Sequence, residues 1–506
     1  MSERDWELMK DAELDLALKN SIPELPPDDI VMEVTPWRKA MNRSLAGLAL
    51  TTITLNFLGL NYILPAVGVI MMLLGFRALR GENGWFKGCW IITSVRTVCI
   101  FASLILNATI YQETVYASRL SDVFIALNVA MVFLMLFLLW KGFRAVKLKA
   151  GLPAHAGGAG AMIVWYALVC LLAAAQYTGW IILIALIFAY VLIIRSLLKL
   201  SRELDEAGYA ICPAAVRVSD RTLVIALLAA VAAGIVCGRL FFNSYPMQWQ
   251  PVEISGDAGT AEIKAELSGL GFPGDILNDL TDEDIKACEG ASRVFVETNF
   301  YSADEGRVVE RVKDGVIYNE TVYDDNLRIT GVAVELDGGR WKIFHHFRWL
   351  NDPGAYGTES LQLWPAYHLQ RQEGWSAVGD VSGRLLCETD GRTLTAPYYS
   401  LGSETYDYDS VFWGTETVTD VFAAFSLPRG GESCRGYVTY DMVKLQDGWM
   451  INSWINYTHQ RSWFLYPAVT ADEYRKSGSW DLDGSFILIQ DALQFFPDDE
   501  DAEMPE

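Results

Sequence analysis

The chain has 506 residues, of which 52% are hydrophobic, and a formal net charge of −22. The charge is distributed unevenly: residues 35–239 contain 18 Lys and Arg against 7 Asp and Glu, whereas residues 243–506 contain 19 against 45. An acidic balance of this size repels phosphate backbones and excludes nucleic-acid binding as the main function. The apolar residues gather in the first half, which predicts a membrane protein with a separate water-soluble domain.

Residues 1–34 form a predicted acidic tail on the cytoplasmic side. The tail is polar and lacks a short apolar core followed by a small-residue cleavage site, so we expect no cleavable signal peptide. Pro23, Pro26 and Pro27 end the short helical pattern that precedes them and favour a stiff linker. The first apolar helix is therefore predicted to be an uncleaved anchor.

Residues 35–242 are predicted to form a bundle of about seven transmembrane helices, because a helix of about 20 apolar residues crosses roughly 30 Å of hydrocarbon. Apolar runs near that length occupy residues 44–60, 62–79, 88–107, 120–140, 160–176, 179–194 and 223–242. The first two runs are nearly continuous, and so are the fifth and sixth. A single helix through either pair would be about 50 Å long, too long for one bilayer, so we predict helical hairpins.

The orientation of the bundle follows from basic residues in its short loops. With seven spans, four basic clusters fall on one side: Arg38, Lys39 and Arg43; Arg77, Arg80 and Lys87; Lys141, Arg144, Lys147 and Lys149; and Arg195, Lys199, Arg202, Arg217 and Arg221. The positive-inside rule then puts the N-terminus in the cytoplasm and everything after residue 242 outside it. We therefore expect a multi-pass protein of the plasma membrane, with the lipid bilayer as its first partner.

Ionisable residues inside the predicted spans are few. Arg96 is the clear example; from a depth of about 12 Å its side chain could reach the interface, or it could have a structural or pore-lining role. The spans contain neither an acid at mid-depth nor a pair of helices broken by Gly and Pro. This pattern disfavours a proton-coupled carrier.

Residues 243–292 are predicted to be a neck followed by short helices. Thr281 and Asp284 have the spacing of a capping box, in which the threonine hydroxyl accepts a backbone N–H of the first turn. The acids between residues 275 and 284 also raise the possibility of a calcium loop. They lack the alternating ligand positions and central glycine of an EF-hand, so helix-start signals explain them better.

Residues 293–490 alternate between apolar and polar side chains and predict a mainly β domain, an antiparallel sandwich or a barrel-like fold. Glycine-containing turns at 337–339 and 447–448 predict two hairpins. The sequence around Trp341 also resembles the sequence around Trp449. Either the domain contains two tandem units, 293–380 and 381–490, or the similarity is fortuitous. Residues 491–506 are predicted to be an acidic C-terminal tail.

Cysteine and histidine spacings in this domain give no metal motif, and we predict neither a metal nor another cofactor. Three cysteines are widely spaced, Cys288, Cys387 and Cys434, so at most one disulfide could form. The histidines are His345, His346, His368 and His459. Two of these are adjacent on one strand and point to opposite faces. We expect buried, hydrogen-bonded histidines rather than zinc ligands.

Aromatic and acidic residues concentrate between residues 397 and 414. Aromatic rings stack on the apolar faces of sugars, while carboxylates accept hydrogen bonds from hydroxyls. The candidate ligand-binding residues are Tyr398, Tyr399, Tyr406, Asp407, Tyr408, Asp409 and Trp413. The alternative for these rings is packing in the core of a β-sandwich.

The preferred hypothesis is a membrane-anchored binding or sensing module that displays its β domain outside the cytoplasm. Its ligand would be an envelope polymer, a peptide or another membrane protein. The first alternative is a non-catalytic membrane subunit of a transport or envelope-assembly complex. The second is a surface hydrolase that uses two carboxylates, which requires a cleft with two acids roughly 5 to 9.5 Å apart. The GxSxG motif of serine hydrolases is not found, and the sequence favours a protein that is not an enzyme.

Overall fold

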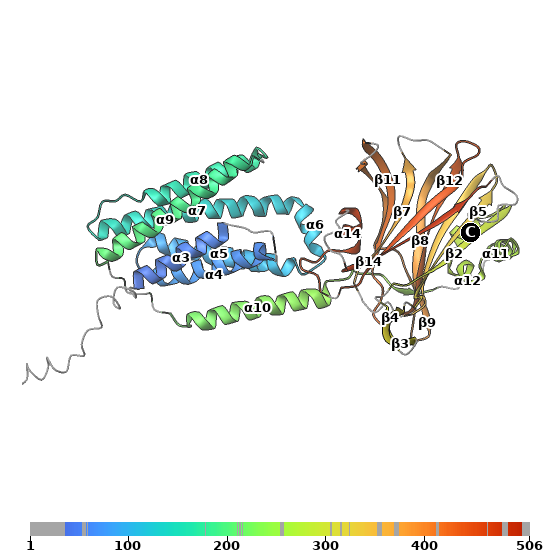
Figure 1. Ribbon diagram of the computed structural model, residues 1–506, viewed down its shortest axis with the longest axis horizontal. Coiled ribbons are helices and arrows are strands. Elements are labelled where there is room, and N and C mark those ends of the chain that lie inside the picture. Colours follow the sequence, from blue (N-terminus) through green and yellow to red (C-terminus); the bar gives the residue numbers. More distant parts are fainter. Residues whose placement is uncertain are drawn as a thin grey trace, which may run out of the picture. The chain divides into compact units, whose positions relative to one another are not determined.

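The structure is a computed structural model of the whole chain. It describes residues 36–52, 57, 59–177, 179–209, 211, 214, 216–252, 258–303, 306–313, 316–322, 324–351, 357–368, 374–410, 414–462, 464–477 and 484–497. The predicted cytoplasmic tail, Trp413 and the end of the predicted C-terminal tail lie outside these residues. The chain divides into two compact units, a helical one and a β-rich one (Figure 1).

Six helices in the described part of the helical unit are long and apolar enough to cross a membrane. They are α4 (Leu60–Leu79), α5 (Gly84–Leu106), α7 (Arg119–Lys149), α8 (Gly157–Ala174), α9 (Trp180–Glu206) and α10 (Asp220–Phe241). The first predicted span falls on α3 (Pro36–Thr52), whose 17 residues extend about 25 Å at 1.5 Å per residue. The helices of a membrane protein are present, whereas the count of seven spans is not confirmed.

Both predicted hairpins consist of two helices. Helices α3 and α4 approach closely because glycines lie where they meet: a Cβ on Gly75 would lie 2.6 Å from the carbonyl oxygen of Ala40, and one on Gly47 would lie 2.4 Å from that of Gly68. Small residues commonly permit such close backbone contact between membrane helices. A further short helix, α6 (Tyr111–Ala117), lies between α5 and α7 and was not predicted.

Ion pairs join the helix ends that carry the predicted basic clusters. Asp220, in the first turn of α10, lies 3.1 Å from Arg43 and 3.2 Å from Arg77. Lys147 Nζ lies 3.1 Å from Glu203 at the end of α9. These contacts bring basic residues of α3, α4 and α7 to the same end of the helical unit.

Arg96 is 6% exposed and lies inside the bundle. Its Nη1 donates to the sulfur of Met135 at 3.8 Å, and its Nε has no hydrogen-bond partner among the described residues. The side chain is thus covered by neighbouring helices instead of extending to the surface, which favours the structural or pore-lining interpretation over the snorkelling one.

The β domain contains two antiparallel sheets that face each other, with one core between them. The seven-stranded sheet has the order β1-β9-β8-β12-β6-β5-β2, and the five-stranded sheet has the order β10-β11-β7-β13-β14. The first consists of β1 (Gln250–Pro251), β9 (Arg392–Ala396), β8 (Trp375–Thr389), β12 (Glu432–Lys444), β6 (Arg340–Trp349), β5 (Leu327–Leu336) and β2 (Arg293–Tyr301). The second consists of β10 (Ser400–Ser410), β11 (Gly414–Phe425), β7 (Glu359–His368), β13 (Ile451–Gln460) and β14 (Phe486–Phe495). The predicted mainly antiparallel β fold is confirmed.

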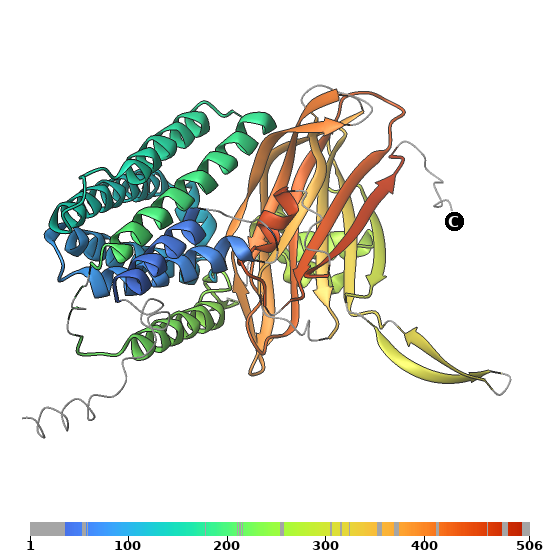
Figure 2. The same cartoon turned by 60° about the vertical axis from the view of Figure 1, so that its left-hand side comes forward.

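Strand β6 shows why the sheets stack, because successive side chains point to opposite faces. Trp341, Ile343 and Phe347 enter the core between the sheets, whereas Phe344 packs against helices on the other side. A separate hairpin, β3 (Arg307–Lys313) and β4 (Val316–Val322), pairs with neither large sheet and projects from the domain (Figure 2).

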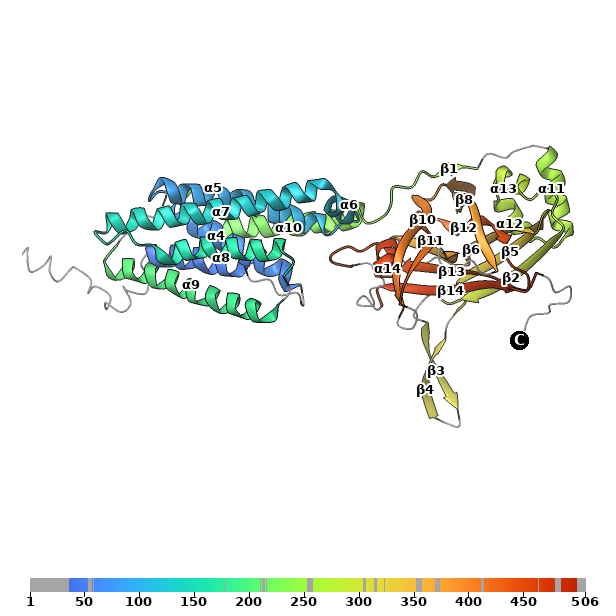
Figure 3. The ribbon, with the colours of Figure 1, turned by 90° about the horizontal axis from the view of Figure 1, so that it is seen from above.

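Three short helices cover the outer face of the seven-stranded sheet (Figure 3): α11 (Ala258–Gly269), α12 (Gly274–Asp279) and α13 (Asp282–Lys286). The predicted cap is confirmed, because the Thr281 hydroxyl accepts the backbone N–H of Asp284 at 3.1 Å. The Asp284 carboxylate also accepts hydrogen bonds from Tyr437 of β12 at 2.5 Å and from Ser382 of β8 at 2.8 Å. The cap therefore also anchors the helices to the sheet.

Strand pairing corrects two predictions. The turn at 337–339 does join β5 and β6 as a hairpin, but the turn at 447–448 connects β12 to β13, which belong to different sheets. Strand β8 crosses the boundary placed at residue 380, and each sheet interleaves strands from both halves. The described domain is one sandwich rather than two tandem units, because its sheets close only when both halves contribute strands.

Two domain boundaries also shift. Strand β14 extends to Phe495, so the predicted tail from residue 491 begins inside a strand, where Asp491 is buried and accepts hydrogen bonds from Asn299 and Tyr301. The segment Asn107–Gln112, placed in the helical bundle by its sequence, belongs to the β-rich unit. There its Asn107 carbonyl accepts the backbone N–H of Ala468 at 2.7 Å.

Candidate functional site

The predicted ligand-binding residues occupy different environments. Tyr398 is only 7% exposed, and its ring packs in the core between the sheets. Tyr399 is 50% exposed and stacks on Tyr245, with ring centroids 4.5 Å apart. The backbone of residues 406–409 lies in β10, while their side chains and all of Trp413 lie outside the described part of the chain. Tyr398 thus follows the core-packing alternative, and ligand binding by the others stays a prediction.

A cavity of about 350 Å³ opens where the end of β6 meets the connection from β11 to β12. It is lined by Leu350, Asn351, Gly430, Gly431, Glu432, Ser433 and Cys434. Ser433 has a φ of 51°, and the register between β8 and β12 shifts beside it, so the lining includes a β-bulge. Small-molecule sites typically have volumes of about 300 to 1,000 Å³, so this cavity has room for a small ligand or for the end of a larger one.

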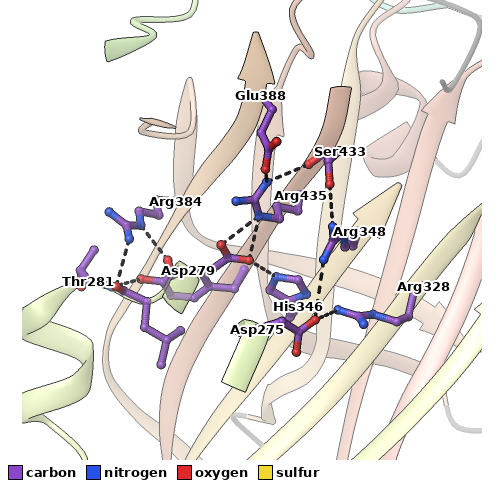
Figure 4. A network of polar contacts seen from close by, with 12 residues as sticks. Asp275, Asp279, Thr281, Arg328, His346, Arg348, Arg384, Glu388, Ser433 and Arg435 are labelled. Carbon is purple, nitrogen blue, oxygen red and sulfur yellow. Dashed lines mark hydrogen bonds and ion pairs between the residues drawn. The ribbon is translucent and has the colours of Figure 1, made fainter. Parts of the chain in front are cut away.

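Two arginines hold the bulge in place (Figure 4). Arg348 donates from Nη2 to the Ser433 hydroxyl at 2.8 Å, and Arg435 donates from Nη1 to the Ser433 carbonyl at 3.0 Å. The same Nη1 lies 3.4 Å from the Glu388 carboxylate. These bonds fix the wall of the cavity before any ligand arrives.

Asp279, at the end of α12, is the buried centre of this network. Arg435 Nε donates to both Asp279 oxygens at 2.9 Å, and His346 Nε2 is hydrogen-bonded to Oδ2 at 3.0 Å. Burial alone would raise the pKa of Asp279, but the bond to His346 and the charge of Arg435 outweigh it and lower that pKa. Burial lowers the pKa of His346. Both lowered pKa values are consistent with a neutral His346 that donates a hydrogen bond to an ionised Asp279.

Further arginine contacts attach α12 to the sheet. Arg328 Nη2 lies 2.6 Å from Asp275, and Arg348 lies 3.8 Å from the same carboxylate. Arg384 donates to the backbone carbonyls of Asp279 at 2.8 Å and Leu280 at 3.0 Å, which lie at the end of α12 (Figure 4). Such bonds satisfy carbonyls that a helix end leaves open. The network thus connects the helical cover, the sheet and the cavity wall.

This arrangement suits recognition better than proton transfer. The network carboxylates of Asp275 and Asp279 are each paired with an arginine and have lowered pKa values, so they are poor proton acceptors at neutral pH. The described cavity lining contains a single carboxylate, Glu432. The pair of acids that the hydrolase alternative requires is therefore not found in the described lining of this cavity.

Two cysteines meet beside the cavity. The register that pairs Leu386 with Arg435 puts Cys387 of β8 opposite Cys434 of β12, and a hydrogen bond between their thiols lowers the pKa of Cys387. Both cysteines are buried and free, as is Cys288. The sequence allowed at most one bridge, and this pair is the one that the strands bring together.

The described histidine side chains of the β domain are buried and hydrogen-bonded, as expected. His345 Nε2 lies 2.7 Å from the Ser453 hydroxyl across the core, and His459 Nδ1 lies 2.7 Å from the Glu359 carboxylate. His346 faces the opposite way from His345 and reaches α12. The side chain of His368 is outside the described residues. No cluster of three potential metal ligands occurs among the residues that the structure describes.

Sequence reasoning did not find the cavity or the Asp279 network. A helix-start signal accounts for Asp284, whose backbone N–H is capped by Thr281, but not for Asp279, which pairs with Arg435. The sequence does contain a signal for this network. His346 and Arg348 follow Phe344 on β6 at two-residue intervals, so all three side chains point to the face that the helices cover. Charged residues on a covered face require buried partners.

Comparisons with known proteins add little. No protein-family model and no curated protein matches this chain. A solved structure titled "AvmM Catalyzes Macrocyclization in Alchivemycin A Biosynthesis" covers 39% of this chain and 97% of its own, with 12% sequence identity and a TM-score of 0.17. A likeness of this size carries no argument about fold or function.

Proposed function

We propose that this protein is a membrane-anchored binding module of the plasma membrane. The helical unit holds it in the bilayer with the N-terminus in the cytoplasm, and the β domain binds its ligand on the other side. The supporting observation is the cavity at Ser433, whose wall is held by Arg348 and Arg435. A preorganised cavity avoids the entropic cost of ordering side chains when a ligand binds.

The proposed orientation rests on charge. Arg43, Arg77 and Lys147, one residue from each of three predicted basic clusters, pair with Asp220 and Glu203 at one end of the helical unit. The positive-inside rule favours the cytoplasm for such an end. The acidic balance of residues 243–506 is compatible with an outside location, because acids contribute little to the rule.

Protease treatment of intact cells tests the orientation. We expect fragments of residues 243–506 to be released, while the basic helix ends after Lys141 in α7 and after Arg202 in α9 stay protected until the cells are opened. Peptide mapping by mass spectrometry identifies the fragments. Release of these basic helix ends with protection of the β domain would reverse the topology and make a cytoplasmic adaptor the leading hypothesis.

Ligand binding at the cavity is tested by a rim substitution that leaves the arginine network intact. The purified full chain is screened in detergent against envelope saccharides and cell-wall peptides, and a ligand present at 100 times its Kd should stabilise the folded state by about 2.7 kcal/mol. Asn351→Trp places a large ring at the exposed rim and should remove this stabilisation.

The matched control is Glu310→Trp on the projecting β3–β4 hairpin, an exposed position away from the cavity. The control should retain the full shift in unfolding temperature. Equal stabilisation of both variants would show that the ligand binds elsewhere on the protein.

A further inference from the structure

The outer face of the five-stranded sheet carries an ordered set of amide and indole side chains. Across β14, β13 and β7, the register places Gln494 opposite Asn452 in one row and puts Ala492, Trp454 and Trp364 in the next. Side chains two residues apart share a face, so these five lie on one surface. They face away from the core, which holds the alternate residues such as Ile455 and Leu493.

The two indoles form the centre of this face. Trp364 is 36% exposed and Trp454 is half-buried, and their rings stack with centroids 5.7 Å apart and planes 20° apart. On its other side Trp454 is opposite Ala492, whose methyl group covers little of a neighbouring ring. Stacking therefore holds the Trp454 ring in position, while the small alanine leaves space beside it for a ligand.

Amides border the indoles and leave hydrogen-bonding atoms free. Gln494 Nε2 donates to Asn452 Oδ1 at 2.7 Å, which orients both groups. The Asn452 amide nitrogen and the Gln494 carbonyl oxygen then remain as an adjacent donor and acceptor. Gln490, in the row on the other side of Trp454, is exposed. An aromatic ring flanked by donor and acceptor pairs matches a sugar, which has an apolar C–H face and hydroxyl groups at its edge.

A short helix, α14 (Ala471–Ser477), sets the limit of this surface. Arg475 of α14 donates to Gln362, and Asp472 accepts from Ser360, so the helix covers the β7 positions that precede Trp364. The helix lies against the five-stranded sheet (Figure 2). The cation of Lys476 is occupied by Asp472 at 2.8 Å and by Glu404. The uncovered strip therefore offers uncharged groups, and the acidic domain around it disfavours anionic polymers.

We infer that the strip formed by Trp364, Trp454, Ala492, Asn452 and Gln494 is a binding site for a neutral polysaccharide. This inference specifies a ligand class for the proposed binding module and rests on that function. It also assigns the contact to a sheet face separate from the cavity at Ser433. A polymer chain can extend along such an open face, whereas a closed pocket would accept only its end.

Isothermal titration calorimetry of the full chain in detergent tests the site, with cellohexaose, chitohexaose, mannohexaose and laminarihexaose as separate probes. We expect at least one probe to bind, and Trp454→Ala to weaken that binding at least tenfold. Ala492→Phe adds bulk beside the ring without removing an indole and should have the same effect. Trp449→Ala, at an exposed tryptophan in the β12–β13 turn, is the matched control and should bind as the unaltered chain does.

Each result is decisive. Absence of binding by all four probes, or binding that survives both Trp454→Ala and Ala492→Phe, overturns the inference. Binding abolished by Asn351→Trp but retained in Ala492→Phe would also overturn it, while supporting the cavity as the binding site. Thermal unfolding of each variant checks that it is folded, and Ala492→Phe keeps the test valid if Trp454→Ala is not.

Discussion

Replacing Arg435 by methionine should lower the free energy of unfolding of the β domain by about 3–5 kcal/mol, because the change leaves a buried carboxylate without its cation. Arg435 and Asp279 are 8% and 4% exposed, and Arg435 Nε donates to both Asp279 oxygens at 2.9 Å. Methionine keeps much of the side-chain volume, so the lost stability comes from removal of the charge more than from a change in packing. Guanidinium unfolding of the full chain, followed by tryptophan fluorescence, measures the change.

Two companion variants identify the source of the loss. Arg311→Met removes an exposed arginine that pairs with Glu320 on the β3–β4 hairpin, and it should cost less than about 1 kcal/mol. Asp279→Asn in the Arg435→Met background removes the unpaired charge and should recover part of the stability. A loss below 1 kcal/mol for Arg435→Met alone would mean that Asp279 is not held as an ionised buried group.

The two parts of the chain differ in how far sequence predicts them. The six long helices, α4, α5 and α7 to α10, follow from apolar runs such as 120–140, because the bilayer imposes a minimum length on every span. Period-two alternation likewise predicts the strands, since one face of each must be buried. Pairing between strands is harder to predict from the sequence. Strand β12 connects to β13 through a glycine turn typical of hairpins, yet the two strands belong to different sheets. Only the packing of the complete sandwich decides that assignment.

The candidate sites could not be predicted from the sequence for the same reason. Asp279 and Arg435 are 156 residues apart, and no local pattern relates a helix end to a strand in another part of the chain. The indole strip depends on the register of three strands, in which Trp364 and Trp454 become direct neighbours although 90 residues separate them. The sequence did suggest that aromatic residues bind a ligand, but it favoured those close together in the chain, between residues 397 and 414.

Acidification should destabilise the β domain through His345, and replacing this histidine should remove that contribution. Burial lowers the pKa of His345 to about 3, whereas the unfolded side chain has a pKa of about 6.5. Between these values only the unfolded chain takes up the proton, so the free energy of unfolding falls as the pH falls. The contribution is constant above about pH 7.5 and falls by about 3 kcal/mol between pH 6.5 and pH 4.

His345→Gln keeps a polar group near the Ser453 hydroxyl but cannot be protonated in this range. Guanidinium unfolding at several pH values should give the variant a pH profile flatter than that of the unaltered chain by about 3 kcal/mol. Other buried groups change the stability with pH in the opposite direction; Asp491, whose pKa is raised by burial, is one of them. These groups are the same in both proteins, so the difference between the two profiles gives the contribution of His345 alone. His155→Gln, at an exposed histidine of the helical unit, should leave the profile unchanged. Parallel profiles for the unaltered chain and His345→Gln would show that His345 is protonated in the folded state, which requires solvent or a counter-charge to reach it inside the sandwich.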